Sequence, residues 1–160
     1  MCIGPIFLPD RDIVIESLNY CRIHKGLELF AYVIMSNHLH IMVRSKTDSL
    51  SDTIRDFKRH TSKKIIESIN EQGESRREWL LMIFRYVAKK HNRNNMYQFW
   101  THNNHAVELS SNEMIDQRID YIHNNPVRAG LVENAEEYLY SSARNYSEMG
   151  NMLEIDLING

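Results

Sequence analysis

The sequence predicts an α+β fold with an antiparallel sheet. Residues 27–35 and 38–45 are rich in apolar, β-branched and aromatic side chains, which is typical of two paired strands. The segments around them instead repeat their apolar residues every three or four positions, which is the period of an amphipathic helix. The expected order is therefore helix, hairpin, helix, helix, short strand and helix, and this order indicates an α+β domain.

The first helix is expected over residues 11–26. Asp10 has the chemistry of an N-cap, because its carboxylate can accept a hydrogen bond from a free amide of the first turn. Gly26 is expected to end the helix, since glycine readily adopts the left-handed conformation that follows many helices. The buried face should carry Val14, Leu18 and Cys21.

The hairpin that follows has Ser36 and Asn37 as its expected turn. Side chains alternate between the two faces of a strand. In the second strand, one face should carry Leu39, Ile41 and Val43, and the other His38, His40, Met42 and Arg44. The two histidines are therefore expected side by side, away from the main apolar face.

Residues 49–70 form the second expected helix, because their apolar positions recur at three- and four-residue steps. The buried set should be Leu50, Ile54, Phe57, Thr61, Ile65 and Ile69. A third helix is expected over residues 78–90, and residues 97–100 are a candidate for a short aromatic strand.

The last expected helix covers residues 111–125. Ser110 and Glu113 have the spacing of a capping box, and Pro126 is expected to end the helix. Its buried stripe should consist of Ile115, Ile119 and Ile122. The remaining segment, through residue 146, is polar and aromatic without a clear period.

Length and composition set further limits. A chain of 160 residues has the size of one domain, so residues 1–160 are expected to fold as a single unit. Membrane-spanning runs and signal-peptide features are absent from the sequence, and Cys2 and Cys21 are too few for a disulfide framework. We therefore expect a cytoplasmic protein without membrane contact. The net charge of −2 means that binding to a polyanion would need a local basic patch.

His38 and His40 have the spacing of a metal-binding pair. Two imidazoles on the same side of one strand, with Cα atoms about 6 to 7 Å apart, can ligate one divalent ion. Solvated or core-packed histidines would show the same spacing. The pair therefore leaves both interpretations open.

Tyr121 and Asn125 are four residues apart on the last helix and so lie on one face, which Arg118 shares. A tyrosine hydroxyl can act as a nucleophile, and an amide oxygen can bind a hard cation. A tyrosine at the core margin and an asparagine that caps a helix end would explain the same pattern.

Two blocks of the sequence resemble a known family. The first is AYVIM with HLHIMV, and the second is DYIHNNPVRAGLV followed by EEYLYSSARNY. In this order and at this distance they are similar to the REP-associated tyrosine transposases, an IS200-like branch of the single-tyrosine HUH transposases. The resemblance runs from about Ile13 to Tyr146.

The resemblance implies roles for the residues that match the family motifs. His38 and His40 would bind a divalent metal, Mg²⁺ or Mn²⁺, and Asn125 would complete the ligand set. Tyr121 would be the nucleophile. A ferredoxin-like antiparallel sheet would carry the histidines, with the tyrosine helix lying across it.

The implied activity is a metal-dependent transesterification of single-stranded DNA at hairpin-associated sites. Tyr121 would attack phosphorus to give a 5′-phosphotyrosine and a free 3′-hydroxyl, and a second 3′-hydroxyl could reverse the step. The implied partner is single-stranded or hairpin DNA, bound by a monomer or homodimer in the cytoplasm at the nucleoid.

Basic and aromatic residues are candidates for contacts with such DNA. The basic candidates are Lys58, Arg59, Lys63, Lys64 and Arg118, and the aromatic ones are Tyr97, Phe99 and Trp100. A solvated helix face is the alternative for the basic residues, and core packing is the alternative for Trp100.

The N-terminal segment departs from the family pattern. Members usually begin with an extended strand, whereas only MCIGPIFLP precedes Asp10, so the first strand is expected to be short or missing. An alternative function is therefore an inactive or domesticated DNA-hairpin binding protein of the same descent. An unrelated metal hydrolase that uses the histidine pair is a third.

Overall fold

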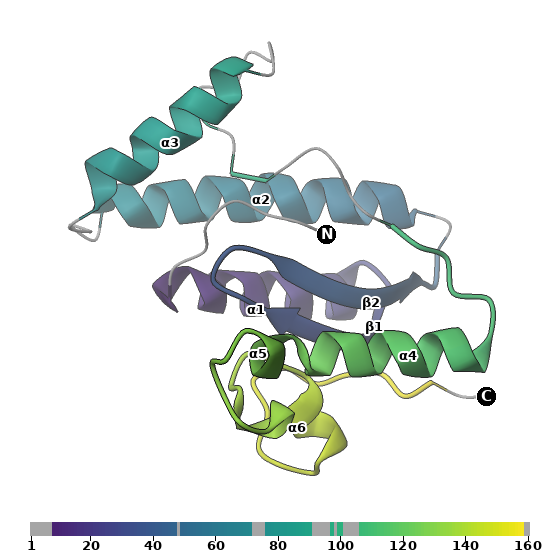
Figure 1. Ribbon diagram of the computed structural model, residues 1–160. Helices are drawn as coiled ribbons and strands as arrows, with labels where there is room; N and C mark the ends of the chain where they lie inside the picture. The colour runs from purple at the N-terminus through teal and green to yellow at the C-terminus, as the bar shows by residue number, and fades with distance from the viewer. Residues whose placement is uncertain are drawn as a thin grey trace.

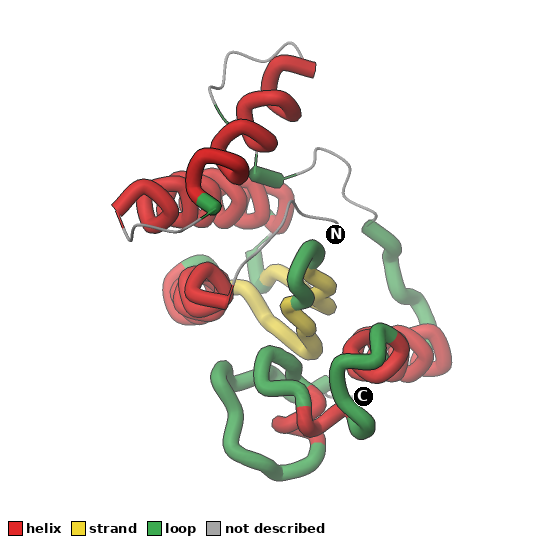
Figure 2. Tube along the Cα trace, turned by 60° about the vertical axis from the view of Figure 1, so that its left-hand side comes forward, coloured by secondary structure: helices red, strands yellow, loops and turns green. Residues whose placement is uncertain are grey.

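The computed structural model describes residues 8–47, 49–71, 76–90, 97, 99–100 and 106–158. The elements in chain order are α1 (Leu8–His24), β1 (Leu27–Ile34), β2 (Leu39–Ser45), α2 (Leu50–Glu71), α3 (Arg77–Lys90), α4 (Asn112–His123), α5 (Asn125–Arg128), the 3₁₀ turn η1 (Ala135–Glu137) and α6 (Ala143–Tyr146). The hairpin lies between α1 and α4, and α2 packs on α1 (Figures 1 and 2). Helices and an antiparallel hairpin thus confirm the expected α+β class.

Helix α1 begins earlier than the sequence predicts. It starts at Leu8, so Asp10 lies inside the first turn and is buried rather than acting as an N-cap. A carboxylate in the first turn interacts favourably with the positive end of the helix dipole, which explains why it is tolerated there. Gly26 has a φ of +64° and follows the helix as expected, since this conformation is unfavourable for residues with a Cβ atom.

The hairpin forms with its turn at Ser36 and Asn37, as expected. Ile34 faces Leu39, Leu27 faces Ser45, and the Met35 amide donates to the carbonyl oxygen of His38 at 2.8 Å to close the turn. A bulge interrupts the pairing between Leu29 and Ala31. The two-strand order β1-β2 is the whole sheet within the described residues.

Burial along the second strand differs from a simple alternation. Leu39 is fully buried as expected, but Ile41 and Val43 are only half-buried, and Met42 on the histidine face is buried. The cause is that α4 contacts both strands, so the face of the hairpin that carries the histidines is also covered by a helix. A strand covered on both faces loses the clear apolar and polar alternation of a half-exposed one.

The segment after α5 covers the free edge of β1. The Ile34 amide donates to the Tyr140 carbonyl at 2.9 Å, and the Ser142 amide donates to the Tyr32 carbonyl at 2.9 Å. Further along, the Asp156 amide donates to the Leu29 carbonyl at 2.7 Å. An uncovered strand edge would leave these backbone groups without partners, so the tail completes the hydrogen bonding of β1.

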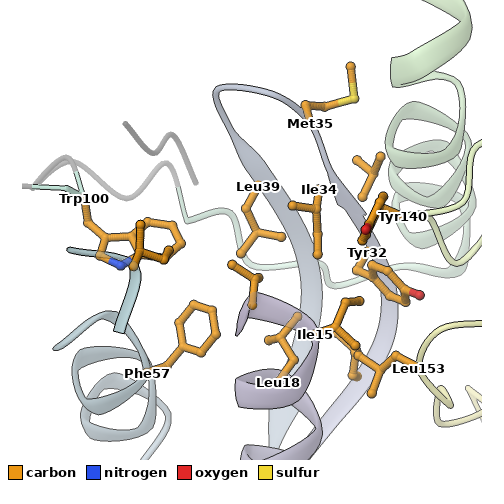
Figure 3. Packing of buried hydrophobic residues seen from close by; sticks show 14 of the residues in the cluster. Ile15, Leu18, Tyr32, Ile34, Met35, Leu39, Phe57, Trp100, Tyr140 and Leu153 are labelled. Atoms are coloured by element: carbon orange, nitrogen blue, oxygen red, sulfur yellow. The ribbon is translucent and has the colours of Figure 1, made fainter. Parts of the chain in front are cut away.

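Two of the aromatic candidates for DNA stacking belong to the core. Phe99 and Trp100 are buried, and Trp100 lies beside Phe57 on the α2 side of the hairpin (Figure 3). The indole N–H of Trp100 donates to Thr61 Oγ1 at 2.9 Å, which satisfies its polar atom inside the core. Neither ring is available to stack on bases. Tyr97 is half-buried, and its hydroxyl accepts from Arg85 at 2.7 Å.

Helix α4 has a different cap and a different end from those predicted. Ser111, not Ser110, is the N-cap, and its hydroxyl accepts from the Met114 amide at 3.2 Å. Ile122 is fully buried, whereas Ile115 and Ile119 pack at the margin of the core.

Pro126 does not stop the helical path. It occupies the first turn of α5, where a missing N–H is tolerated. The Arg128 amide then donates to the Asn124 carbonyl at 2.9 Å, so the helical hydrogen bonding continues across the proline.

The expected first strand lies mostly outside the described residues, because the description begins at residue 8. Residues 97, 99 and 100 of the second strand candidate are described and belong to no assigned strand. Among the helices of the described residues, none has the combined length and hydropathy of a membrane-spanning segment.

Candidate active site

His38 and His40 lie side by side at the start of β2. Their ring centroids are 4.8 Å apart, with the rings edge to face. Leu39 between them points away into the core (Figure 3). The alternation of the strand therefore places the two imidazoles together, as the sequence predicts.

Tyr121 reaches the histidine pair from α4. Its ring centroid is 5.4 Å from that of His40, and 37% of the residue is exposed. This contact depends on tertiary folding, because α4 follows β2 by more than 60 residues in the chain. The exposed fraction leaves the ring accessible to a substrate.

Asn125 completes the cluster on the next turn. Its Oδ1 atom lies 3.1 Å from His38 Nε2. The spacing of four residues brings Asn125 and Tyr121 to one helical face, and that face lies against the hairpin. All four side chains that the family resemblance singles out are thus close together.

Asn37 orients the ring of His38. Its Oδ1 atom is 2.7 Å from His38 Nδ1, and an amide oxygen can only accept, so Nδ1 carries the proton of this hydrogen bond. In the neutral ring Nε2 then has a free electron pair that faces Asn125 Oδ1. Two electron pairs that converge on one point are the arrangement that a bound cation satisfies.

His40 is held in its neutral form. Burial lowers its pKa to about 4, and the nearby charges of His38 and Arg118 act in the same direction. A neutral imidazole is the form that ligates a metal. Within the described residues no group of three or more His, Cys, Asp or Glu side chains could hold a metal ion, and the Asn125 amide oxygen lies beside the histidine pair. The set of two imidazoles and one amide oxygen fits a divalent cation.

His123 anchors the tyrosine helix to the sheet. Its Nε2 atom lies 2.8 Å from the Ser142 hydroxyl, which also accepts from the Tyr32 amide of β1 at 2.8 Å. Burial lowers the pKa of His123 to about 4, so this anchor is neutral. This role was not predicted from the sequence, although His123 follows Ile119 of the buried stripe by four residues and so lies on a neighbouring part of the same face.

Two guanidinium groups lie over the Tyr121 ring. Arg118 is 5.5 Å and Arg128 is 5.1 Å from the ring centroid. Arg118 was predicted from its place on the helical face. Arg128 was missed because the helix was expected to end before Pro126. Its position seven residues after Tyr121 would have indicated the same face.

The basic candidates on α2 have acidic neighbours on their own helix. Arg59 donates to Asp56 at 3.2 Å, and both Lys63 and Lys64 approach Glu67 at 3.8 Å. Exposed pairs of this kind are weak, so the cations remain able to exchange partners. Burial lowers the pKa of Lys58, whose ammonium group lies 6.0 Å from the centre of the Trp100 ring.

A cavity adjoins the histidine pair. It has a volume of about 960 Å³ and lies along β2, between the first turns of α2 and the α4 face. His40 and Arg118 belong to its wall, and much of the remaining wall is apolar, including Ile41, Leu50, Ile54 and Ile115. The cavity therefore has room for an extended chain beside His40 and Arg118.

Residues 9–81 match the family model described as "Transposase IS200 like". No curated protein matches the chain. A solved structure of a REP-associated tyrosine transposase bound to a REP hairpin is similar in fold, with a TM-score of 0.62 and 12% sequence identity. The similarity covers 99% of this chain and 84% of that one. The matched segment, residues 9–81, includes the hairpin with both site histidines, and this part of the chain is similar to the IS200-like transposases.

Proposed function

We propose that this protein is a metal-dependent transposase that cleaves and rejoins single-stranded DNA through a 5′-phosphotyrosine on Tyr121. The observation that carries the proposal is the cluster of Tyr121, His40, His38 and Asn125. The tyrosine ring contacts one histidine at 5.4 Å between centroids, and the asparagine oxygen lies 3.1 Å from the other. A nucleophile beside a cation-binding set is the constellation that phosphoryl transfer requires.

His38, His40 and Asn125 would hold the metal, for which we propose Mg²⁺ or Mn²⁺. When bound, the ion would polarise the phosphodiester and stabilise the negative charge that develops on its oxygens. Asn37 keeps the His38 ring in the orientation that presents Nε2, and the burial of His40 keeps its ring free of a proton.

Tyr121 performs the covalent step. Its hydroxyl oxygen attacks phosphorus, the bond from phosphorus to the 3′-oxygen breaks, and the 3′-oxygen leaves as a hydroxyl. The tyrosine proton passes to solvent, and the departing oxygen takes a proton from solvent, so the step has no net proton change. The phosphodiester is kept as an ester of tyrosine, and a second 3′-hydroxyl can therefore reverse the reaction without a nucleotide cofactor.

The substrate we propose is single-stranded DNA beside a hairpin. The solved relative is bound to a REP hairpin, and the cavity along β2 has room for an extended strand beside His40 and Arg118. We further propose that residues 1–160 form one tyrosine-HUH domain with a ferredoxin-like sheet, acting at the nucleoid as a monomer or homodimer. The fold similarity over 99% of the chain supports a single domain.

The test uses a labelled single strand that carries a hairpin, incubated with the protein and Mn²⁺. The expected product is a covalent band that survives denaturing electrophoresis. Tyr121→Phe keeps the aromatic ring but removes the attacking oxygen, so the variant should bind the hairpin and form no covalent band. His38→Ala should also form none at low Mn²⁺, and excess Mn²⁺ should restore part of the product.

Two outcomes would decide against the proposal. Hairpin binding by the parent without any covalent band would favour the inactive or domesticated binding protein. Cleavage by Tyr121→Phe at the parental rate would mean that water attacks, and a metal hydrolase would then be the better description.

A further inference from the structure

Four side chains of the tyrosine helix form one stripe. Arg118, Tyr121, Asn125 and Arg128 are separated by three, four and three residues, which is the spacing of one helical face. The stripe runs across the boundary between α4 and α5, because the amides of Arg128 and Ala129 donate to the carbonyls of Asn124 and Asn125 at 2.9 and 3.0 Å. Tyr121 and Asn125 have roles in the proposed reaction, whereas Arg128 has none so far.

The guanidinium of Arg128 is placed over the nucleophile. It lies 5.1 Å from the Tyr121 ring centroid, and Arg118 lies 5.5 Å from the same point. Gly130, with a φ of +68°, turns the chain directly after this position, and its amide donates to the Val127 carbonyl at 2.9 Å. The turn ends α5 at Arg128 and so fixes the arginine at the end of the stripe.

Neither guanidinium is neutralised by a carboxylate within the described residues. Arg22, Arg44 and Arg55 pair with Asp156, Glu28 and Asp52 at distances of 3.1, 2.7 and 2.7 Å. Arg118 and Arg128 have no such pair in the part of the chain that the structure describes. The positive charges of Arg118 and Arg128 repel each other near the Tyr121 ring. An anion bound between the two guanidinium groups would offset this repulsion. Arg128 is also exposed, so an anion can reach it.

We propose that Arg128, together with Arg118, forms a guanidinium clamp that binds the non-bridging oxygens of the phosphodiester attacked by Tyr121. This inference rests on the proposed function and deepens it. Arginine suits the role because its planar fork donates two parallel hydrogen bonds to a phosphate. The clamp holds the phosphorus near the Tyr121 oxygen before the attack and then holds the phosphotyrosine diester until the second 3′-hydroxyl arrives.

Removal of one guanidinium group of the clamp should slow the covalent step more than it weakens hairpin binding. Arg128→Ala should lower the single-turnover rate of covalent band formation about 100-fold at saturating DNA, which is the usual effect of removing one donor to the transition state. Hairpin affinity should change by no more than about threefold, because one phosphate contact among many contributes little to overall binding. Arg128→Lys keeps the charge without the fork and should be intermediate.

Chemical rescue separates contact with the phosphate from a structural role. Millimolar guanidinium added to Arg128→Ala should restore at least a tenth of the lost rate and leave Tyr121→Phe inactive. Arg55→Ala is the matched control, since it removes an exposed arginine of α2 that pairs with Asp52, and its rate should equal that of the parent. Thermal unfolding of each variant checks that the fold is intact.

The outcomes distinguish the two proposals. If the parent forms the covalent band and Arg128→Ala forms it at the parental rate, the clamp is wrong and the proposed function stands. If Arg128→Ala loses rate and hairpin affinity equally, and guanidinium restores neither, Arg128 is a general DNA or structural contact and the clamp is again wrong. If the parent forms no covalent band, the proposed function fails and the clamp fails with it.

Discussion

Asn125 Oδ1 lies 3.1 Å from His38 Nε2, which joins the tyrosine helix to the turn of the hairpin. The contact connects residues 87 positions apart in the sequence. Because Asn37 occupies the other ring nitrogen of His38, the contact points both electron pairs at one location. The geometry makes the asparagine a candidate metal ligand, because a cation between the two atoms would accept both electron pairs.

The first prediction concerns that ligand. Asn125→Ala should weaken Mn²⁺ binding to the free protein at least tenfold, because one of three donors is lost. Asn125→Asp should strengthen it, since a carboxylate adds charge to the same oxygen position. Calorimetric titration with Mn²⁺ measures both. Asn124→Ala is the control, because the Asn124 side chain is exposed and donates to its own helix at the Asp120 carbonyl. Equal affinities for all four proteins would exclude Asn125 from the metal site.

The second prediction concerns the anchor of α4. His123→Ala should lower the free energy of unfolding by about 1–3 kcal/mol, because it leaves a buried hydroxyl of Ser142 without one partner. The rate of covalent band formation should fall as well, since Tyr121 lies on the helix that loses its anchor. Urea unfolding measures the stability. His60→Ala, at an exposed position on α2, should behave like the parent. Parental stability of His123→Ala would show that packing alone holds the helix.

The third prediction is a dependence of stability on pH. Burial raises the pKa of Asp156, but hydrogen bonds from the Arg22 guanidinium and the Leu29 amide outweigh it, so the pKa lies below its usual value. A lowered carboxylate pKa stabilises the folded state above the unfolded pKa of about 4, and this contribution is lost as pH falls through the folded pKa.

Asp156→Asn should therefore be less stable than the parent by about 1 kcal/mol at pH 7, and the difference should shrink below pH 4. Urea unfolding at pH 7 and pH 3 measures it. Asp52→Asn is the control, because its carboxylate is mostly exposed and pairs with Arg55 on the same helix. A difference of the same size at both pH values would mean that the charge of Asp156 does not contribute.

The fourth prediction concerns the basic residues of α2. If they contact DNA, replacing Lys58, Arg59, Lys63 and Lys64 with alanine should reduce the salt dependence of hairpin binding by up to about one unit of slope each. Glu67→Gln should instead increase the salt dependence of hairpin binding, because it releases Lys63 and Lys64 from their shared carboxylate partner. Binding measured over a range of salt concentrations tests both. If the salt dependence of binding is unchanged in both variants, the four basic residues of α2 belong to an ordinary solvated helix face.

Elements with a local period could be predicted from the amino-acid sequence. The stripe of Phe57, Ile65 and Ile69 predicted α2, and glycine at position 26 predicted the end of α1. Strand alternation placed His38 beside His40, and helical spacing placed Tyr121 and Asn125 on one face of the helix. These relationships follow from the geometry of one strand or one helix, so no other part of the chain is needed to establish them.

The contacts between elements distant in the sequence could not be predicted in this way. The edge of β1 pairs with residues near Tyr140 and with Asp156, and these contacts join segments more than 100 residues apart that share no sequence period. Met42 is buried because α4 covers the histidine face of the hairpin. Arg128 reaches the Tyr121 ring because the helical path continues past Pro126, where the first turn of a new helix tolerates the missing amide. Burial and hydrogen bonding between distant segments depend on the packing of the whole chain, and no local pattern encodes that packing.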